Sequence, residues 1–101
     1  MTTSRFPTVD PQEKVVLSLD FVKRLVLGET ITTATLDVKT DNGMDSDAAT
    51  RFGTPQIDGS KVLVAFSGGI DGADYHIKFI VETDNPDSIP VYARILPCRK
   101  A

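Results

Sequence analysis

The sequence contains few residues of the kinds that support disulfide or metal chemistry. Its 101 residues include one cysteine, Cys98, one histidine, His76, and no tryptophan. A single cysteine excludes an internal disulfide, and neither residue belongs to a spacing typical of a metal site. Cys98 follows Pro97 near the C-terminus, where we expect a small, half-buried apolar residue.

Basic residues are outnumbered, and long apolar runs are missing. The chain has 11 Lys and Arg against 14 Asp and Glu, and its net charge is −3. The basic residues are scattered, and Arg99 and Lys100 form a basic pair near the C-terminus. Nucleic-acid binding needs clustered basic residues, so we expect no nucleic-acid partner. No apolar run approaches the ~20 residues of a membrane span, and residues 1–10 lack a signal-peptide core. We therefore expect a soluble protein without a membrane partner, made in a reducing cytoplasm.

Alternating apolar and polar residues predict short strands along most of the chain. The clearest case is residues 61–82, where KVLVAFS and ADYHIKFIVE flank SGGIDG. Period-two alternation on both sides of a glycine-rich connection predicts an antiparallel hairpin with one buried face. Residues 21–27 predict either one helical turn or an edge strand. Further strands are expected at residues 13–20, 30–39, 54–58 and 89–96.

This pattern predicts an all-β protein. About six or seven short antiparallel strands, separated by frequent turn signals, are typical of an immunoglobulin-like β-sandwich. The length corresponds to one domain with a single two-layer core. We expect this sandwich at residues 13–101. Residues 1–12, which contain Pro7 and Pro11, are expected to form an extended N-terminal arm.

The arm contains the candidate interaction residues. Phe6, Pro7 and Val9 place apolar groups in a segment that we expect to be extended. Terminal segments are often ordered only where they dock. The three residues therefore fit an arm that docks on a neighbouring subunit, and they fit equally a segment that flanks the first strand of its own domain.

No group of residues predicts a catalytic site. Ser67 lies in FSGG, which differs from the G-x-S-x-G elbow of hydrolases. The glycines of residues 68–72 lack phosphate-loop spacing and precede a strand where a helix N-terminus is required. We expect them to supply positive φ angles in a connection. The sequence predicts no enzyme, no catalytic residue and no cofactor.

An acidic loop keeps a different class of function open. Asp41, Asp45 and Asp47 lie in DNGMDSD, and carboxylates on a loop can gather Ca²⁺. Their spacing differs from that of an EF-hand, and a solvated loop is the simpler interpretation. A carbohydrate- or calcium-binding β-sandwich therefore stays an alternative function, with no metal ligand assigned.

Several motifs resemble those of small tailed-phage virion proteins, the fibre-tail adaptor or Ig-like structural type. The family's Asp-Pro-x-Glu after an arm is similar to residues 10–13 (DPQE). The family's next motif, Asp-Trp, is similar to residues 20–21 (DF). The leucine and the Gly-Asp-x-Ile motif that follow it are similar to Leu25 and to residues 28–31 (GETI).

The second half of the chain continues the resemblance. The family's Ser-Gly-Gly, later glycine and Tyr-x-Ile strand are similar to residues 67–69 (SGG), Gly72 and residues 75–77 (YHI). Two features depart from the family pattern. Phe21 replaces the usual tryptophan, which a buried aromatic position tolerates. Residues 83–88 (TDNPDS) replace a turn of the type Thr-x-Gly-Arg.

The resemblance covers residues 10–83 and implies a non-enzymatic structural component of a tailed bacteriophage virion. Such proteins sit in symmetric rings at the head–tail or tail–fibre junction and bridge larger subunits. Several copies are therefore implied, with tail, connector or fibre subunits as partners. A capsid decoration or cement protein is the alternative placement within the virion.

Overall fold

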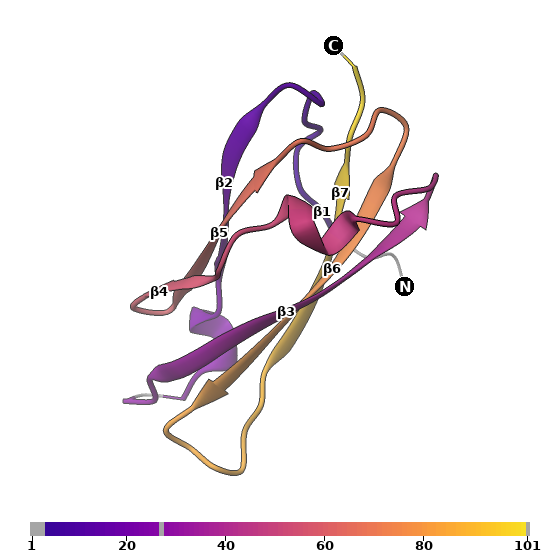
Figure 1. Ribbon diagram of the computed structural model, residues 1–101. Coiled ribbons are helices and arrows are strands. Elements are labelled where there is room, and N and C mark those ends of the chain that lie inside the picture. The colour runs from indigo at the N-terminus through magenta and orange to yellow at the C-terminus, as the bar shows by residue number, and fades with distance from the viewer. Residues whose placement is uncertain (1–3, 27, 101) are drawn as a thin grey trace.

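Two β-sheets pack face to face in the computed structural model, which describes residues 4–26 and 28–100 (Figure 1). Parts of the predicted arm (residues 1–3) and of the predicted 21–27 segment (residue 27), and residue 101, lie outside the described residues. The elements are β1 (Ser4–Arg5), β2 (Lys14–Asp20), the 3-10 helix η1 (Val22–Arg24), β3 (Ile31–Asn42), the 3-10 helix η2 (Ala48–Arg51), β4 (Gln56–Asp58), β5 (Lys61–Ser67), β6 (Asp74–Thr83) and β7 (Val91–Pro97).

The strand order is that of an immunoglobulin-like sandwich. One sheet has the order β1-β7-β6-β3 and the other has the order β2-β5-β4. Immunoglobulin domains place strands B, E and D in one sheet and strands C, F and G in the other. Taken in chain order as B to G, β2 to β7 occupy these positions. The predicted fold class is confirmed, with one difference: β1 runs parallel to β7.

The core fills the space between the two sheets. Alternate residues of β5 and β6 are buried, as their sequence pattern predicts. Phe21 is fully buried and packs against the Tyr92 ring, with centroids 4.9 Å apart. Phe21 thus occupies a buried position of the kind that was expected to tolerate the replacement of tryptophan. The largest fully buried side chains are those of Tyr75, Phe21, Phe66, Phe79, Ile77, Leu96, Val62, Val64, Val81 and Cys98.

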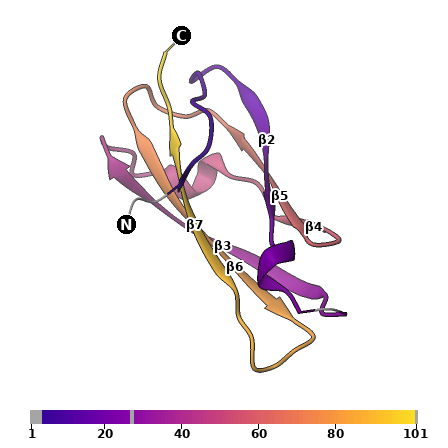
Figure 2. The same ribbon diagram turned by 180° about the vertical axis from the view of Figure 1, so that it is seen from behind.

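The predicted hairpin at residues 61–82 is wrong. β5 pairs with β2 and β4, whereas β6 pairs with β3 and β7. The connection at residues 68–73 therefore crosses from one sheet to the other, as Figures 1 and 2 show. Alternation identifies which face of a strand is buried, but it does not identify the strand alongside. β5 and β6 bury their apolar faces against each other across the core.

Glycines shape this crossover. Gly68 and Gly72 have φ angles of 73° and 89°, so the prediction of positive φ holds at both. Gly69 has a different role, because a Cβ there would lie 2.7 Å from Phe66 Cζ and 2.8 Å from Cys98 Sγ. The backbone at Gly69 thus packs directly on the core. Cys98, expected to be half-buried, is fully buried beneath it.

Two short segments form 3-10 turns. η1 contains the helical turn considered for residues 21–27, so the edge-strand alternative is wrong. Asp20 Oδ1 accepts a hydrogen bond from Val22 N–H (2.9 Å), which fixes the start of this turn. η2 was not expected from the sequence. Within the part of the chain that is described, no helix is long and apolar enough to cross a membrane.

We predict that Gly69→Ala destabilises the fold by about 1–3 kcal/mol, because the added methyl group clashes with two fully buried side chains. Gly53→Ala is the matched control, since its Cβ would lie at an ordinary 3.6 Å from Ala65 Cβ. Urea unfolding followed by circular dichroism measures both. Equal stability of the two variants would contradict this account of the crossover.

Candidate functional site

A compact turn joins the N-terminal arm to β2. Asp10 Oδ1 accepts the Gln12 N–H (2.8 Å), and Asp10 O accepts the Glu13 N–H (2.9 Å). The Glu13 carboxylate accepts in return from the Asp10 N–H (2.8 Å). Three backbone N–H groups of the DPQE sequence are therefore hydrogen-bonded within the turn itself, where the chain passes from the edge of one sheet to the other.

The described part of the arm lies along β7 of its own domain, visible beside the yellow strand in Figure 2. Phe6 N–H donates to Ile95 O (2.8 Å), and Val9 N–H donates to Pro97 O (3.1 Å). Arg99 N–H donates to Val9 O (2.9 Å). These bonds extend the parallel pairing of β1 with β7 toward the C-terminus.

The three predicted interaction residues have different environments. Val9 is only 5% exposed and lies beside Cys98, with which it forms a bridge. Phe6 is half-buried and contacts the Phe79 ring edge-on, with centroids 6.1 Å apart. Pro7 is exposed. The structure thus places Phe6 and Val9 in the packing of their own domain and leaves Pro7 at the surface.

An apolar groove of about 330 Å³ separates the arm from β2. Val16, one of the residues that line it, is 66% exposed. The groove is lined by Phe6, Pro7, Thr8, Val9, Glu13, Val15, Val16, Leu17 and Ser18.

Two arginines protect the remainder of the β7 edge. Arg24 Nη1 donates to Val91 O (3.3 Å), and Arg94 Nη1 donates to Ala93 O (2.9 Å). Both guanidinium groups lie over the Tyr92 ring, 5.1 Å and 4.8 Å from its centroid. The outward carbonyls of β7 are therefore capped by arginines at one end and by the arm at the other. Sequence reasoning missed these caps, because Arg24 and Val91 are far apart in the chain.

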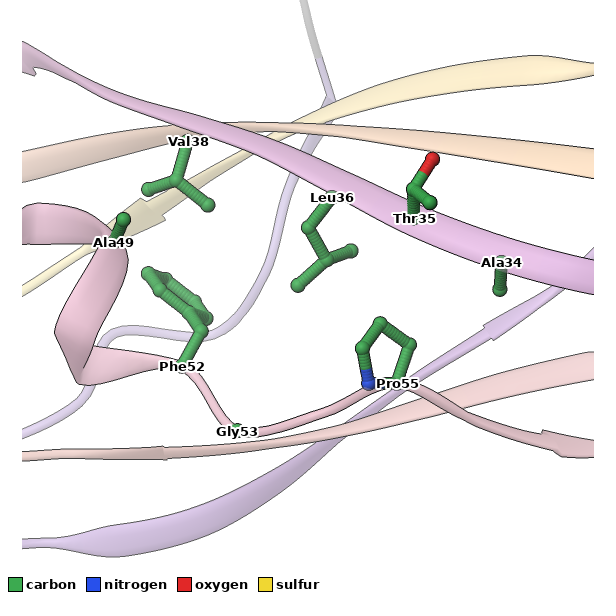
Figure 3. A pocket seen from close by; sticks show the side chains of 8 residues that line it. All are labelled: Ala34, Thr35, Leu36, Val38, Ala49, Phe52, Gly53 and Pro55. Carbon is green, nitrogen blue, oxygen red and sulfur yellow. The ribbon is translucent and has the colours of Figure 1, made fainter.

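The opposite side of the sandwich carries a second groove, of about 310 Å³, along β3 (Figure 3). Leu36 and Val38 project from β3 toward Phe52 and Pro55, which belong to the connection between η2 and β4. β3 forms the edge of its sheet, with β6 as its hydrogen-bonded neighbour. This side combines apolar side chains with an exposed strand edge, which are the features of a surface that accepts an extended segment.

A polar cluster fixes the loop after β3. Asp45, whose side chain is 2% exposed, forms an ion pair with Arg51 (Nε to Oδ2, 3.1 Å). Asp45 also accepts a hydrogen bond from the Tyr75 hydroxyl (2.6 Å), and that hydroxyl accepts one from Ile70 N–H (3.0 Å). The cluster joins the loop after β3, the crossover at residues 68–73 and the start of β6.

The protonation states of this cluster are fixed around neutral pH. Burial alone would raise the pKa of Asp45, but hydrogen bonds from Arg51 and Tyr75 outweigh it and lower that pKa below its ordinary value of 3.8. Burial and the Asp45 carboxylate raise the pKa of Tyr75 to about 12. A neutral Tyr75 hydroxyl therefore donates to an ionised Asp45 over a wide pH range.

The acidic loop differs from a solvated cluster. Asp41 and Asp47 are exposed, whereas the side chain of Asp45 is shielded from solvent and paired with Arg51. Across residues 4–26 and 28–100, no group of three or more His, Cys, Asp or Glu side chains is arranged to hold a metal ion. Ser67 lies in β5 and His76 in β6, in different sheets.

The chain is a small immunoglobulin-like sandwich with one apolar groove beside β2 and another beside β3, an architecture that many structural and binding domains share. The family model described as podophage GP4 fiber-tail adaptor protein gp77 matches residues 10–89, which is most of the chain. The chain belongs to this family, so the predicted resemblance is confirmed, and it is a structural component of a phage particle, associated with the tail fibres. No curated protein and no solved structure matches the chain.

We predict that Asp45→Asn lowers the free energy of unfolding at pH 7 by about 1–3 kcal/mol, because Arg51 and Tyr75 lose an ionised partner. The pKa of Asp45 is lower in the folded state, so its contribution is present above pH 3.8 and is lost as the pH falls through the folded value. The variant should therefore lose less stability than the wild type between pH 6 and pH 2.

Urea titrations across this pH range provide the measurement. Asp41→Asn is the control, since Asp41 is exposed and should leave the curve unchanged. Parallel curves for the wild type and Asp45→Asn would contradict the assigned role.

We predict that Cys98 reports the docking of the arm. The thiol is fully buried beside Val9, and burial raises the pKa of Cys98, so labelling by a disulfide reagent should be slow. Val9→Ala weakens the cover and should accelerate labelling about tenfold, through more frequent local opening. Pro7→Ala, at an exposed position, should leave the rate unchanged. Equal rates in the two variants would show that the arm does not cover the thiol.

Proposed function

We propose that this chain is a non-enzymatic bridging module that joins tail or head–tail connector subunits to fibre subunits. Membership of the fibre-tail adaptor family over residues 10–89 carries the proposal. An adaptor needs a rigid body and more than one contact surface. The sandwich supplies the body, and its two open sides supply surfaces that face in different directions.

The chemistry of the described residues supports a binding role. Two titratable groups of the interior whose pKa values are shifted, Asp45 and Tyr75, bond to each other and hold a loop in place. Several apolar side chains are exposed, and Val16 among them lines the groove beside the arm. The exposed apolar side chains include Val16, Val22, Val26, Met44, Ile57, Ile70, Ile89 and Val91.

We further propose that the arm and the groove beside it contact a partner virion protein. Pro7 is exposed next to the groove, and Phe6 and Val9 hold the arm in position by packing beneath it. A rigid, extended contact of this kind loses little conformational entropy on binding. We propose that several copies enter one symmetric virion, which is assembled in the host cytoplasm. Simultaneous contacts by these copies would strengthen modest individual contacts by avidity.

We predict that phage particles carrying Pro7→Asp in this protein assemble fewer fibres, because a carboxylate is placed on the apolar contact surface. The stability of the isolated variant should stay unchanged, since Pro7 is exposed. Gln56→Asp, exposed on β4 at another edge, is the matched control. Electron cryomicroscopy of purified particles measures fibre occupancy and locates the chain.

Two outcomes would overturn the proposal. Density for this chain on the capsid lattice alone would assign the decoration role instead. Full fibre occupancy in particles lacking the protein would exclude a bridging role at the fibre.

A further inference from the structure

The two edges of the larger sheet differ in how they meet solvent. The β7 edge is covered by the arm and by Arg24 and Arg94. The β3 edge has the groove beside it and no such cap among the described residues. Uncovered edge strands are templates for pairing with another chain.

The outward backbone groups of β3 can be identified from the register. Val81 N–H donates to Pro90 O (3.1 Å), so the odd-numbered residues of β6 direct their backbone groups toward β7. The even-numbered residues, such as Lys78, then face β3, where Lys78 pairs with Asp37. Odd-numbered residues of β3 are therefore bonded to β6. The N–H and C=O groups of Leu36, Val38 and Thr40 point away from the sheet.

The side chains of β3 alternate between the two faces of the sheet, and two of the residues with outward backbone groups have side chains that line the groove. Asp37 and Lys39 are exposed on the outer face, whereas Leu36 and Val38 are half-buried and line the groove. The two ion pairs found among the described residues, Arg51–Asp45 and Arg99–Asp74, involve other side chains. Register shifts near Ile31 and Thr40 limit the regular part of the edge to the middle of the strand.

We propose that two copies of this chain pair through their β3 edges, antiparallel, around a twofold axis at Val38. In this register Val38 lies opposite Val38 of the second copy, and Leu36 lies opposite its Thr40. These are the residues with outward backbone groups, so they form the hydrogen-bonded pairs. Asp37 then lies opposite Lys39 of the second copy in a non-hydrogen-bonded pair, where side chains are closest.

Charge complementarity selects a second copy as the occupant. The twofold axis produces the Asp37–Lys39 pair twice, so one strand supplies both charges that its partner needs. Shifting the axis by one outward residue, to Leu36, would place Asp37 opposite Thr35 and remove both pairs. The added strand also directs its own Leu36 and Val38 toward the side where Phe52 and Pro55 line the groove. The apolar layer of the sandwich thus continues into the second copy.

The contact is isologous and closes at two copies. This proposed contact between two copies goes beyond the adaptor role, because it requires neither ring formation nor fibre binding. The test can therefore be carried out on the isolated protein, and its outcome is independent of the particle experiment.

The experiment uses charge reversal at positions 37 and 39. Sedimentation velocity over a concentration series should show a monomer–dimer equilibrium for the wild type. D37K and K39D should each weaken dimerisation about tenfold or more, because each places like charges opposite one another twice. The double variant D37K/K39D restores opposite charges and should recover the wild-type affinity.

Mixing the two single variants gives the sharpest comparison. D37K carries two cations at these positions and K39D carries two anions, so the mixed pair has a cation opposite an anion at both sites. Native mass spectrometry should detect the heterodimer at concentrations at which each variant alone is monomeric. Melting temperatures of all variants are measured, because D37K also places a second cation opposite Lys78. K39D, opposite His76, provides the second test of the same contact.

A wild-type protein that stays monomeric at its highest soluble concentration overturns the proposal. A dimer with the same affinity in D37K, K39D and the double variant overturns it as well. Recovery in the double variant together with heterodimer formation on mixing supports both the β3 edge and the register centred on Val38.

Discussion

The Tyr75 hydroxyl fixes the corner on which the two-layer arrangement depends. It accepts from Ile70 N–H and donates to Asp45, so one buried group holds the crossover between the sheets and the loop after β3. A tyrosine at the start of the sixth strand that bonds to backbone a few residues upstream is a known feature of immunoglobulin-like corners. Arg51 completes the cluster by keeping Asp45 ionised. A change in the path of the crossover or of the loop after β3 would therefore break a hydrogen bond of this hydroxyl.

Once this corner is fixed, the strand edges decide how the molecule meets its surroundings. The β7 edge is occupied by the chain's own arm and by two guanidinium groups stacked on Tyr92. Edge-to-edge association through β7 is therefore blocked, as in many natural sheets that cover an edge. The β3 edge has no equivalent cover among the described residues, and its side chains combine an apolar inner row with a charged outer row. The β3 edge is thus the side of this sheet that is proposed for association.

The sequence predicted local properties better than long-range ones. Alternation in residues 61–66 and 75–81 identified the buried faces correctly, because a strand with one solvated side repeats every two residues. The same alternation suggested a hairpin, since a glycine-rich link does not show whether the chain turns within a sheet or crosses between sheets. The caps on β7 and the partners of Asp45 depend on contacts between distant residues. The fold class was therefore accessible from the sequence, whereas the grooves and edges that form the candidate site were not.

The motifs that carry the family resemblance lie at strand ends, which explains why they predict the fold and not the contact surfaces. In the DPQE turn, side-chain oxygens accept hydrogen bonds from the backbone N–H groups of the same turn. Glu29 accepts a hydrogen bond from the hydroxyl of Thr83, where the turn that differs from the family pattern begins. Gly69 allows the crossover to contact the core. Each motif does structural work at a strand end, so together they specify the scaffold and say little about its partners. The residues proposed to make contacts, on the arm and on the outer row of β3, lie outside these motifs. The motifs thus account for the shape of the domain, and the contacts proposed for the arm and for the β3 edge rest on side chains outside the motifs.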